Sequence, residues 1–263
     1  MIVAKFAAVL KKDAITALRY RNGFVFAWLA QVAQLATFYF LSRAVGPQFH
    51  PDGMPYFLFL LMGTGFYTFL LAGAHSFLRT IQESQQAGTL EVLLTTATPA
   101  PVLVALNAAS AFAGGIVQFG FCIAIGVLFF SPMVHANLAA CFLVFLFSVL
   151  ISGAIGLFAA GLQIAIHKGS AVLWLVGSGA WLMSGTLFPT SALPRPIQTI
   201  ANCIPFTHSL TGLRLALLSG NQPTIFREIE VLGLFAMLLV PTGAAFFSWT
   251  VREARQAGSL SFY

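Results

Sequence analysis

Long apolar runs separated by short polar interruptions dominate the chain between residues 24 and 251. A helix that crosses a bilayer needs about 20 mostly apolar residues, and several of these runs reach that length. The interruptions contain proline and glycine, which separate helices. The pattern predicts an all-α integral membrane protein, one domain over residues 1–263, with six transmembrane helices over residues 24–41, 56–77, 102–130, 137–166, 170–188 and 230–251.

The first 22 residues are basic and amphipathic. Lys5, Lys12 and Arg19 are seven residues apart, so they share one face of a helix, and Phe6 and Val9 lie away from it. Such a helix lies on the membrane surface with its basic face toward anionic headgroups. A signal peptide is the alternative, but the following run is long for one and no small-residue cleavage site follows. We expect an interfacial helix over residues 1–22 and an uncleaved first span.

Residues 189–220 are too polar and too rich in proline to cross a membrane. Pro194, Pro196 and Pro205 each suit the first turn of a short helix. An apolar stripe follows at helical spacing, formed by Phe206, Leu210, Leu213 and Leu217. The segment predicts re-entrant helices in the outer leaflet, buried against the protein, with an ordinary surface loop as the alternative.

The stretch QAGTLEVLLTTATP, residues 86–99, interrupts the apolar pattern between the second and third runs. Gly88 breaks or caps a helix, and Thr89 is a suitable N-cap residue for a new one. Glu91 then falls in the first turn, where its charge complements the helix dipole. Leu90 and the leucines after it give an apolar face, and Pro99 requires the helix to stop. The stretch predicts a short surface helix that is suited to docking into the groove of a partner.

Small residues recur every four positions in the fourth apolar run: Ser148, Ser152, Gly156 and Ala160. Small residues at this spacing allow helices to approach closely. The stripe favours packing within the helical bundle, and a contact between two copies of the chain is the alternative.

Composition supports the membrane interpretation. Charged residues make up 8% of the chain and hydrophobic residues 59%, whereas a soluble domain has about 25% charged residues. The net charge of +6 would also fit nucleic-acid binding, but this composition argues against it. Cys122, Cys141 and Cys203 have no metal-binding or disulfide spacing, so we expect them to pack as small apolar residues.

The positions of the basic residues predict the orientation. With both termini inside, nine Lys and Arg residues fall in inside segments and four in outside segments, which favours cytoplasmic termini. The inside set is Lys5, Lys11, Lys12, Arg19, Arg21, Arg79, Lys168, Arg252 and Arg255, and the outside set is Arg43, Arg195, Arg214 and Arg227.

Several kinds of chemistry are missing from the pattern. No acidic or basic side chain lies in the middle of a predicted span, which argues against proton-coupled or sodium-coupled transport. The chain has no GxxxxGK[ST] phosphate loop, so it has no visible means of hydrolysing ATP. It has no convincing Ser/His/Asp or HExxH arrangement either. We therefore expect no catalytic residue, cofactor or metal site in this chain.

Three stretches resemble the permease subunits of the type 2 ATP-binding-cassette (ABC) exporter family. ESQQAGTLEVLLTTATP is similar to the E-x-GTLE-x-LL-x-TP pattern after the second span of that family. SGTLFPTSALPRPIQTIANCIPFTHSLTGLR, residues 184–214, is similar to the FP-x-x-x-LP signature before the last span, and KKDAITALRYR leads into the first span. With the six-span layout, the resemblance covers nearly the whole chain.

The resemblance implies a half-transporter in a bacterial inner membrane that forms a homodimer with a second permease copy and contacts membrane lipid. Each copy would engage a separate cytoplasmic ABC ATPase, which would bind the ATP and magnesium. Residues 80–98 would be the coupling-helix region. The expected ATPase contacts are Glu83, Gly88, Thr89, Leu90 and Glu91.

The function that follows is export of a lipophilic, drug-like or lipid-linked substrate. Phe66, Phe69 and Trp181 are candidates for the substrate path, although packing is the more common role of such residues. A non-transporting membrane scaffold or assembly factor that recruits a cytoplasmic partner is the alternative function. A membrane enzyme would need clustered polar side chains, and the sequence does not predict any.

Overall fold

The computed structural model describes residues 21–46, 48–88, 100–130, 136–218 and 222–256 of the chain. Within these ranges every regular element is helical, as predicted. The longer helices are α2 (Arg21–Val45), α3 (Tyr56–Gln86), α5 (Ala100–Phe130), α6 (Leu138–Ile166), α7 (Gly169–Met183), α8 (Arg195–Asn202), α9 (Pro205–Leu217) and α10 (Gln222–Gln256), and the short 3-10 helices are η1 (Pro51–Gly53) and η2 (Thr190–Ala192).

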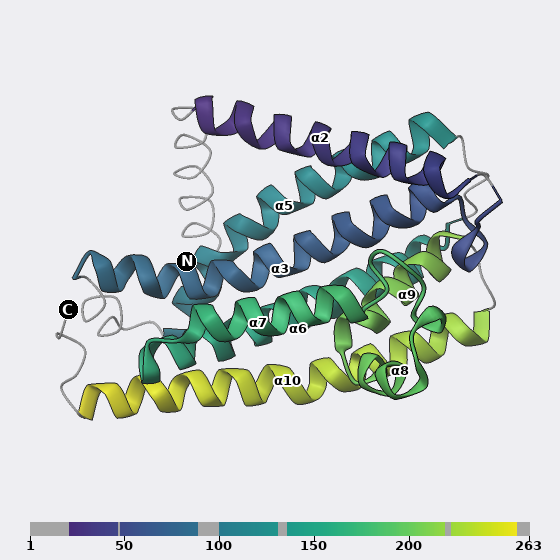
Figure 1. Cartoon of the computed structure of the whole chain (residues 1–263). Coiled ribbons are helices and arrows are strands. Elements are labelled where there is room, and N and C mark those ends of the chain that lie inside the picture. Colours follow the sequence, from purple (N-terminus) through teal and green to yellow (C-terminus); the bar gives the residue numbers. More distant parts are fainter. Residues whose placement is uncertain (1–20, 47, 89–99, 131–135, 219–221, 257–263) are drawn as a thin grey trace.

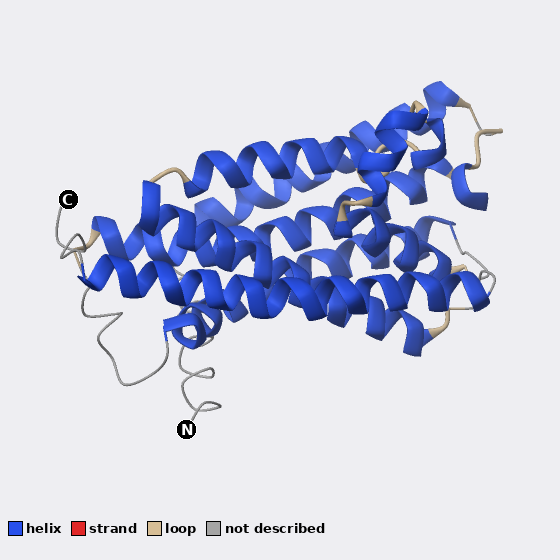
Figure 2. Cartoon of the chain, turned by 90° about the horizontal axis from the view of Figure 1, so that it is seen from below, coloured by secondary structure: helices blue, strands red, loops and turns tan. Residues whose placement is uncertain are grey.

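The helices form one elongated bundle around α3 (Figures 1 and 2). Helices α5 and α6 pack along α3, and α10 packs along α6. The short helix α9 packs against both α6 and α10, while α2 lies at the edge of the bundle and contacts α3. The start of α2 and the end of α10 lie at one end, and α8 and α9 lie at the other.

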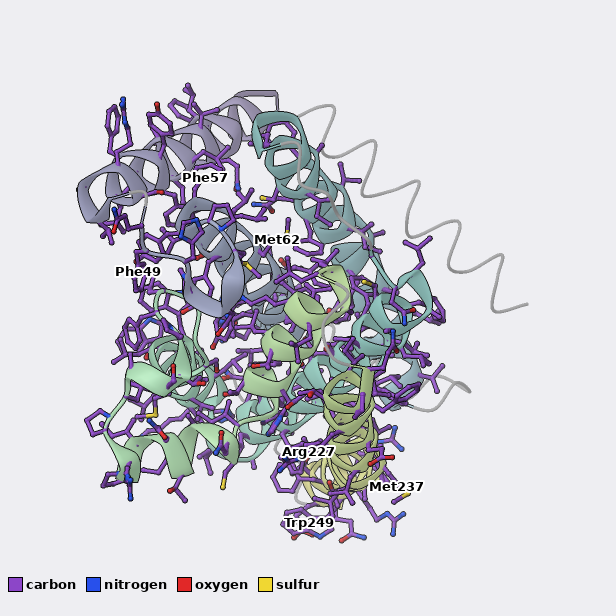
Figure 3. All side chains as sticks on the ribbon, turned by 90° about the vertical axis from the view of Figure 1, so that its right-hand side faces the viewer. Phe49, Phe57, Met62, Arg227, Met237 and Trp249 are labelled. Carbon is purple, nitrogen blue, oxygen red and sulfur yellow. The ribbon has the colours of Figure 1, made fainter. Side chains whose placement is uncertain are left out.

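Three of the described helices are long and apolar enough to cross a membrane: α3, α6 and α10. The outward face of α10 is apolar, since Met237 is 73% and Trp249 56% exposed, whereas Phe57 and Met62 of α3 are buried (Figure 3). An exposed apolar face of this kind suits a lipid environment. Each predicted span has a helix over most of its length, but the number of crossings stays a prediction.

Two predicted boundaries change in the structure. The fifth span was predicted over residues 170–188, but α7 ends at Met183, where the Ser184 amide bonds to the Ala180 carbonyl and Gly185 takes a φ of 78°. Only glycine adopts this left-handed conformation readily, so the chain turns there. The predicted coupling-helix region begins at residue 80, but residues 80–86 belong to α3, because the helical pattern continues to Gln86.

The small residues of α6 pack inside the chain. The hydroxyls of Ser148 and Ser209 are 2.8 Å apart, which links α6 to α9, and the hydroxyl of Ser152 donates to the Leu70 carbonyl of α3. A Cβ atom on Gly156 would lie 2.7 Å from the carbonyl oxygen of Ala74, so α3 and α6 are in close contact there. The structure confirms the packing interpretation of this stripe.

Candidate functional site

The end of α3 carries Glu83, the first of the predicted coupling residues. Its carboxylate Oε1 lies 2.6 Å from the Arg79 Nε one turn earlier, and both side chains are largely exposed. An exposed pair at this spacing contributes only about 0.3–0.5 kcal/mol to stability. The pair therefore leaves Glu83 on the surface, where a partner could reach it.

Gly88 ends the described part of this segment. The Ala87 amide bonds to the Glu83 carbonyl and the Gly88 amide to the Gln85 carbonyl, which closes the last turn of α3. Gly88 has a φ of 64°, so the chain leaves the helix axis in a left-handed turn. The sequence correctly predicted a helix end at this glycine. The other coupling residues, Thr89, Leu90 and Glu91, lie outside the described residues.

A buried contact between two amides joins the last turn of α3 to α6. The Gln163 Nε2 donates to Gln85 Oε1 at 3.3 Å, and both residues are buried. The Gln163 Oε1 has no hydrogen-bond partner among the described residues. The residues just before Gly88 are thereby fixed to the interior of the bundle rather than only to its surface.

The turn after α6 lies next to this amide pair. His167 takes a φ of 55°, and α7 starts two residues later at Gly169. A Cβ atom on Gly169 would overlap the carbonyl oxygen of Ala159 and would lie 2.8 Å from the backbone nitrogen of Gln163. The start of α7 is therefore packed tightly on the same turn of α6 that holds Gln85.

The candidate substrate-path residues lie in an aromatic cluster at the centre of the bundle. The Phe66 ring is 5.2 Å from Phe119, and the Phe69 ring is 5.2 Å from Phe145. Phe66 and Phe69 are both buried, and Trp181 packs partly buried against the same cluster. These contacts show that Phe66 and Phe69 pack in the core of the bundle. A role of these residues in a substrate path stays a prediction.

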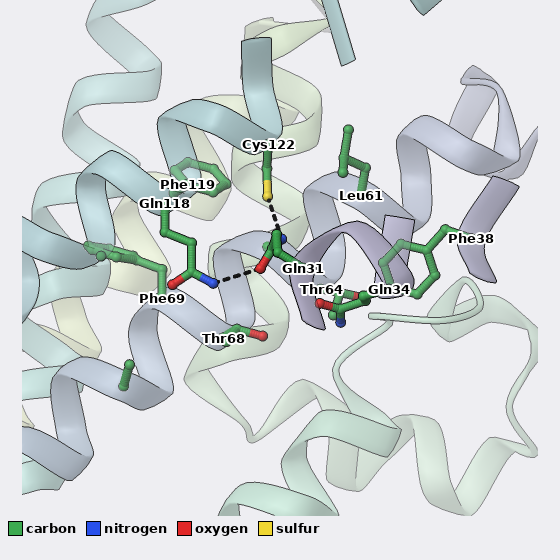
Figure 4. Close-up of a pocket in the computed structure, with 13 residues that line it drawn as sticks. Gln31, Gln34, Phe38, Leu61, Thr64, Thr68, Phe69, Gln118, Phe119 and Cys122 are labelled. Atoms are coloured by element: carbon green, nitrogen blue, oxygen red, sulfur yellow. Dashed lines mark hydrogen bonds between the residues drawn. The ribbon is translucent and has the colours of Figure 1, made fainter. Parts of the chain in front are cut away.

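A small cavity with several polar side chains on mostly apolar walls lies beside this cluster, between α2, α3 and α5 (Figure 4). The Gln118 amide donates to Gln31 Oε1 at 2.7 Å, and the Gln31 amide donates to the Cys122 sulfur at 3.2 Å. Thr64 also lines the cavity, and its buried hydroxyl has no partner among the described residues. The volume of about 20 Å³ is enough for one water molecule. Gln31 of the first predicted span thus bonds across to α5 through both Gln118 and Cys122.

A larger cavity of about 270 Å³ lies between α7 and the turn from α8 to α9. Its walls include Leu71, Ile155, Val176 and Phe206, and they are almost entirely apolar. A cavity of about 150 Å³ with apolar walls is known to stay dry and to take up small apolar molecules. This cavity is therefore chemically suited to an apolar ligand.

The predicted apolar stripe lies along α9. Phe206, Leu210 and Leu213 are buried in the central core, and Leu217 is partly buried against it. Helix α8 begins beside Pro196 and α9 begins at Pro205, so the prolines open helices as predicted. The surface-loop alternative is wrong for this segment.

Arg214 on α9 is a buried cation that the sequence did not single out as a site residue. Its guanidinium lies 3.6 Å from the centre of the Phe59 ring, and Nη2 donates to the Phe59 carbonyl at 3.2 Å. Asp52 of η1 is the nearby acid, at 3.9 Å from Nη1. Burial lowers the pKa of Arg214 to about 10, and Asp52 opposes this change. Arg214 therefore stays charged near neutral pH and joins α9 to α3 and to η1.

Sequence reasoning also missed the contact between His208 of α9 and Glu228 of α10. Twenty residues separate the two, and they lie on different helices, so their spacing carries no periodic signal. The position of Arg214 directly after a stripe leucine was a usable signal, because residue 214 lies four positions after Leu210 and on the same side of α9.

The all-helical bundle with long apolar helices defines a multi-pass membrane protein. The family model described as ABC-2 type transporter matches residues 4–218, which is most of the chain. The chain belongs to this family and is a permease subunit of a type 2 ABC transporter. A comparison with curated proteins gave no match. Members of the family normally work with an ATP-binding subunit, and the permease is not itself the ATPase.

Proposed function

We propose that the chain exports a lipophilic, drug-like or lipid-linked molecule across a bacterial inner membrane. A homodimer of the chain would carry out transport, both termini would lie in the cytoplasm, and a separate cytoplasmic ATPase would bind and hydrolyse magnesium-ATP. The apolar cavity of about 270 Å³ beside α7 supports an apolar substrate. The scaffold alternative shares the ATPase contact but not the transport.

The observation that carries the proposal is the continuity of α3. One unbroken helix runs from Tyr56 through Phe66 and Phe69 to the turn at Gly88. A displacement of the segment after Gly88 would therefore be passed along a rigid element to the centre of the bundle. Gln85 and Gln163 support the same route, because they tie the last turn of α3 to α6.

Charge reversal at Glu91 tests the coupling role. In the full-length permease reconstituted with its ABC ATPase, we expect Glu91→Lys to weaken ATPase docking about tenfold, which corresponds to about 1.4 kcal/mol. ATP hydrolysis and transport of a lipophilic dye are measured in the same vesicles. Glu253→Lys is the matched control, because Glu253 is an exposed acid near the end of α10.

The outcomes separate the candidate functions. Export of the dye with ATP hydrolysis supports a transporter, and loss of both in Glu91→Lys but not in Glu253→Lys supports the coupling role. ATPase binding without transport of any compound in a lipophilic panel would favour the scaffold. Unchanged docking in Glu91→Lys would remove this residue from the contact.

A further inference from the structure

Three helices meet around the His208 ring at the end of the molecule that holds α8 and α9. Its Nδ1 lies 2.7 Å from Oε2 of Glu228 on α10, and its Nε2 lies 2.9 Å from the carbonyl oxygen of Asn202 on α8. The ring centre is 5.9 Å from that of Phe235. The side chains of His208 and Glu228 are only 16% and 15% exposed, so water competes little for these contacts.

Both neighbours of the ring are hydrogen-bond acceptors. A backbone carbonyl has no proton to donate, nor has an ionised carboxylate, and a neutral imidazole has only one N–H group. The two contacts can form together only if the His208–Glu228 pair holds one proton more than a neutral ring and an ionised carboxylate. The distance of 2.7 Å is typical of a hydrogen bond between charged groups.

We propose that His208 is a positioning residue that, with this extra proton, latches α8 and α9 to α10. When the proton leaves to solvent, the ring keeps one donor for two acceptors, so one of the two contacts is lost. The latch is a property of the chain itself, whereas its effect on transport rests on the proposed function.

The charges around the ring favour the protonated form. The hydrogen bond that His208 donates to Glu228 is the main cause that raises the pKa of His208, while burial and the charge of Arg227 oppose this rise. Figure 3 looks onto this end of the molecule and labels Arg227. Helices α6 and α7 have no charged residue, and the charged residues on α8 and α10 near this end are Arg195, Arg227, Glu228 and Glu230.

The direction of the pH effect follows from the raised pKa. A histidine whose pKa is higher in the folded protein than the ordinary 6.5 contributes stability that is fully present below pH 6.5. That contribution is lost as the pH rises through the raised value. The latch is therefore closed in mildly acidic solution and opens toward alkaline pH.

The two sides of α9 differ in how they can be released. Arg214 fixes α9 to α3 and keeps its charge near neutral pH, so that side does not respond to small pH changes. His208 fixes α9 to α10 through a group that titrates in the accessible range. Loss of the proton would break one of the two contacts that hold α9 to α8 and α10, while the contact of α9 with α3 stays unchanged.

Histidine NMR of the full-length protein in lipid nanodiscs tests the latch directly. The His208 signal is assigned by its disappearance in His208→Gln. We expect it to titrate with a midpoint above 6.5 and to shift to a lower midpoint in Glu228→Gln, which keeps the shape of the side chain. His50→Gln is the control, because His50 is exposed and bonds only to the Gln48 carbonyl among the described residues. A His208 midpoint at or below 6.5, or no change of the midpoint in Glu228→Gln, would overturn the proposal.

The second measurement is the pH profile of dye export by the permease–ATPase complex. Wild type and His50→Gln should share one pH-dependent step, and His208→Gln should lose it. Identical pH profiles of export in wild type and His208→Gln would show that His208 has no positioning role in transport. Absence of export at every pH would count against the proposed function, while the NMR midpoint would still decide whether the latch exists.

Discussion

At one end of the bundle, α3 stops just before Gly88. There two neutral amides make the buried contact between α3 and α6, and the nearby ion pair of Arg79 and Glu83 is exposed. At the opposite end, α9 is held by a buried arginine and by a largely buried His–Glu pair. Removing one partner of a buried charged pair lowers the stability of the fold strongly, whereas removing one partner of an exposed pair lowers it little. The difference indicates specific buried contacts at the α9 end, whereas the charged side chains at the Gly88 end stay accessible on the surface.

The largest expected effect comes from adding a methyl group beside Arg214. In Gly63→Ala the new Cβ would overlap the Arg214 guanidinium and would lie 2.7 Å from the Thr186 carbonyl oxygen. We expect the free energy of unfolding to fall by about 1–3 kcal/mol, measured by denaturation of the full-length protein in detergent. Gly120→Ala is the control, because its Cβ would meet nothing within 4 Å, and it should not destabilise the helix. Equal stability of the two variants would contradict tight packing around Arg214.

Breaking the Gln85–Gln163 pair near Gly88 should lower the free energy of unfolding by a similar or smaller amount. Gln163→Met removes the donor and leaves the Oε1 of buried Gln85 without its partner, which costs about 1–3 kcal/mol. Replacing both glutamines with methionine should restore much of the loss, because no polar group is then left unpaired. A double variant less stable than the single variant in the same denaturation assay would count against the pairing.

The smallest expected change in stability is at Glu83. Because its pair with Arg79 is exposed, Glu83→Gln should change the free energy of unfolding by less than about 0.5 kcal/mol. Under the proposed function the same variant should still weaken ATPase docking. A loss of stability as large as that of Gln163→Met would contradict the contrast between exposed and buried contacts.

Local features of the chain were predicted from the sequence better than contacts between distant residues. The α9 stripe and the helix end at Gly88 follow from periodicity, proline and glycine, which act over a few neighbouring residues. The end of α7 was wrong by five residues, because apolar residues continue through Leu187 and Phe188 and conceal the turn that Gly185 makes. The contact partners of Arg214 and His208 could not be predicted, because they come from distant parts of the chain.

By itself, the sequence determined the all-helical class, the membrane environment and the type 2 ABC permease family, because these depend on composition, on periodicity and on short motifs. The tertiary structure decided which polar residues meet: Gln85 with Gln163, Arg214 with Phe59 and Asp52, and His208 with Glu228. The partners in these pairs are separated by 20 to more than 150 residues in the sequence. They meet only because the helices pack together, and no local propensity encodes that packing.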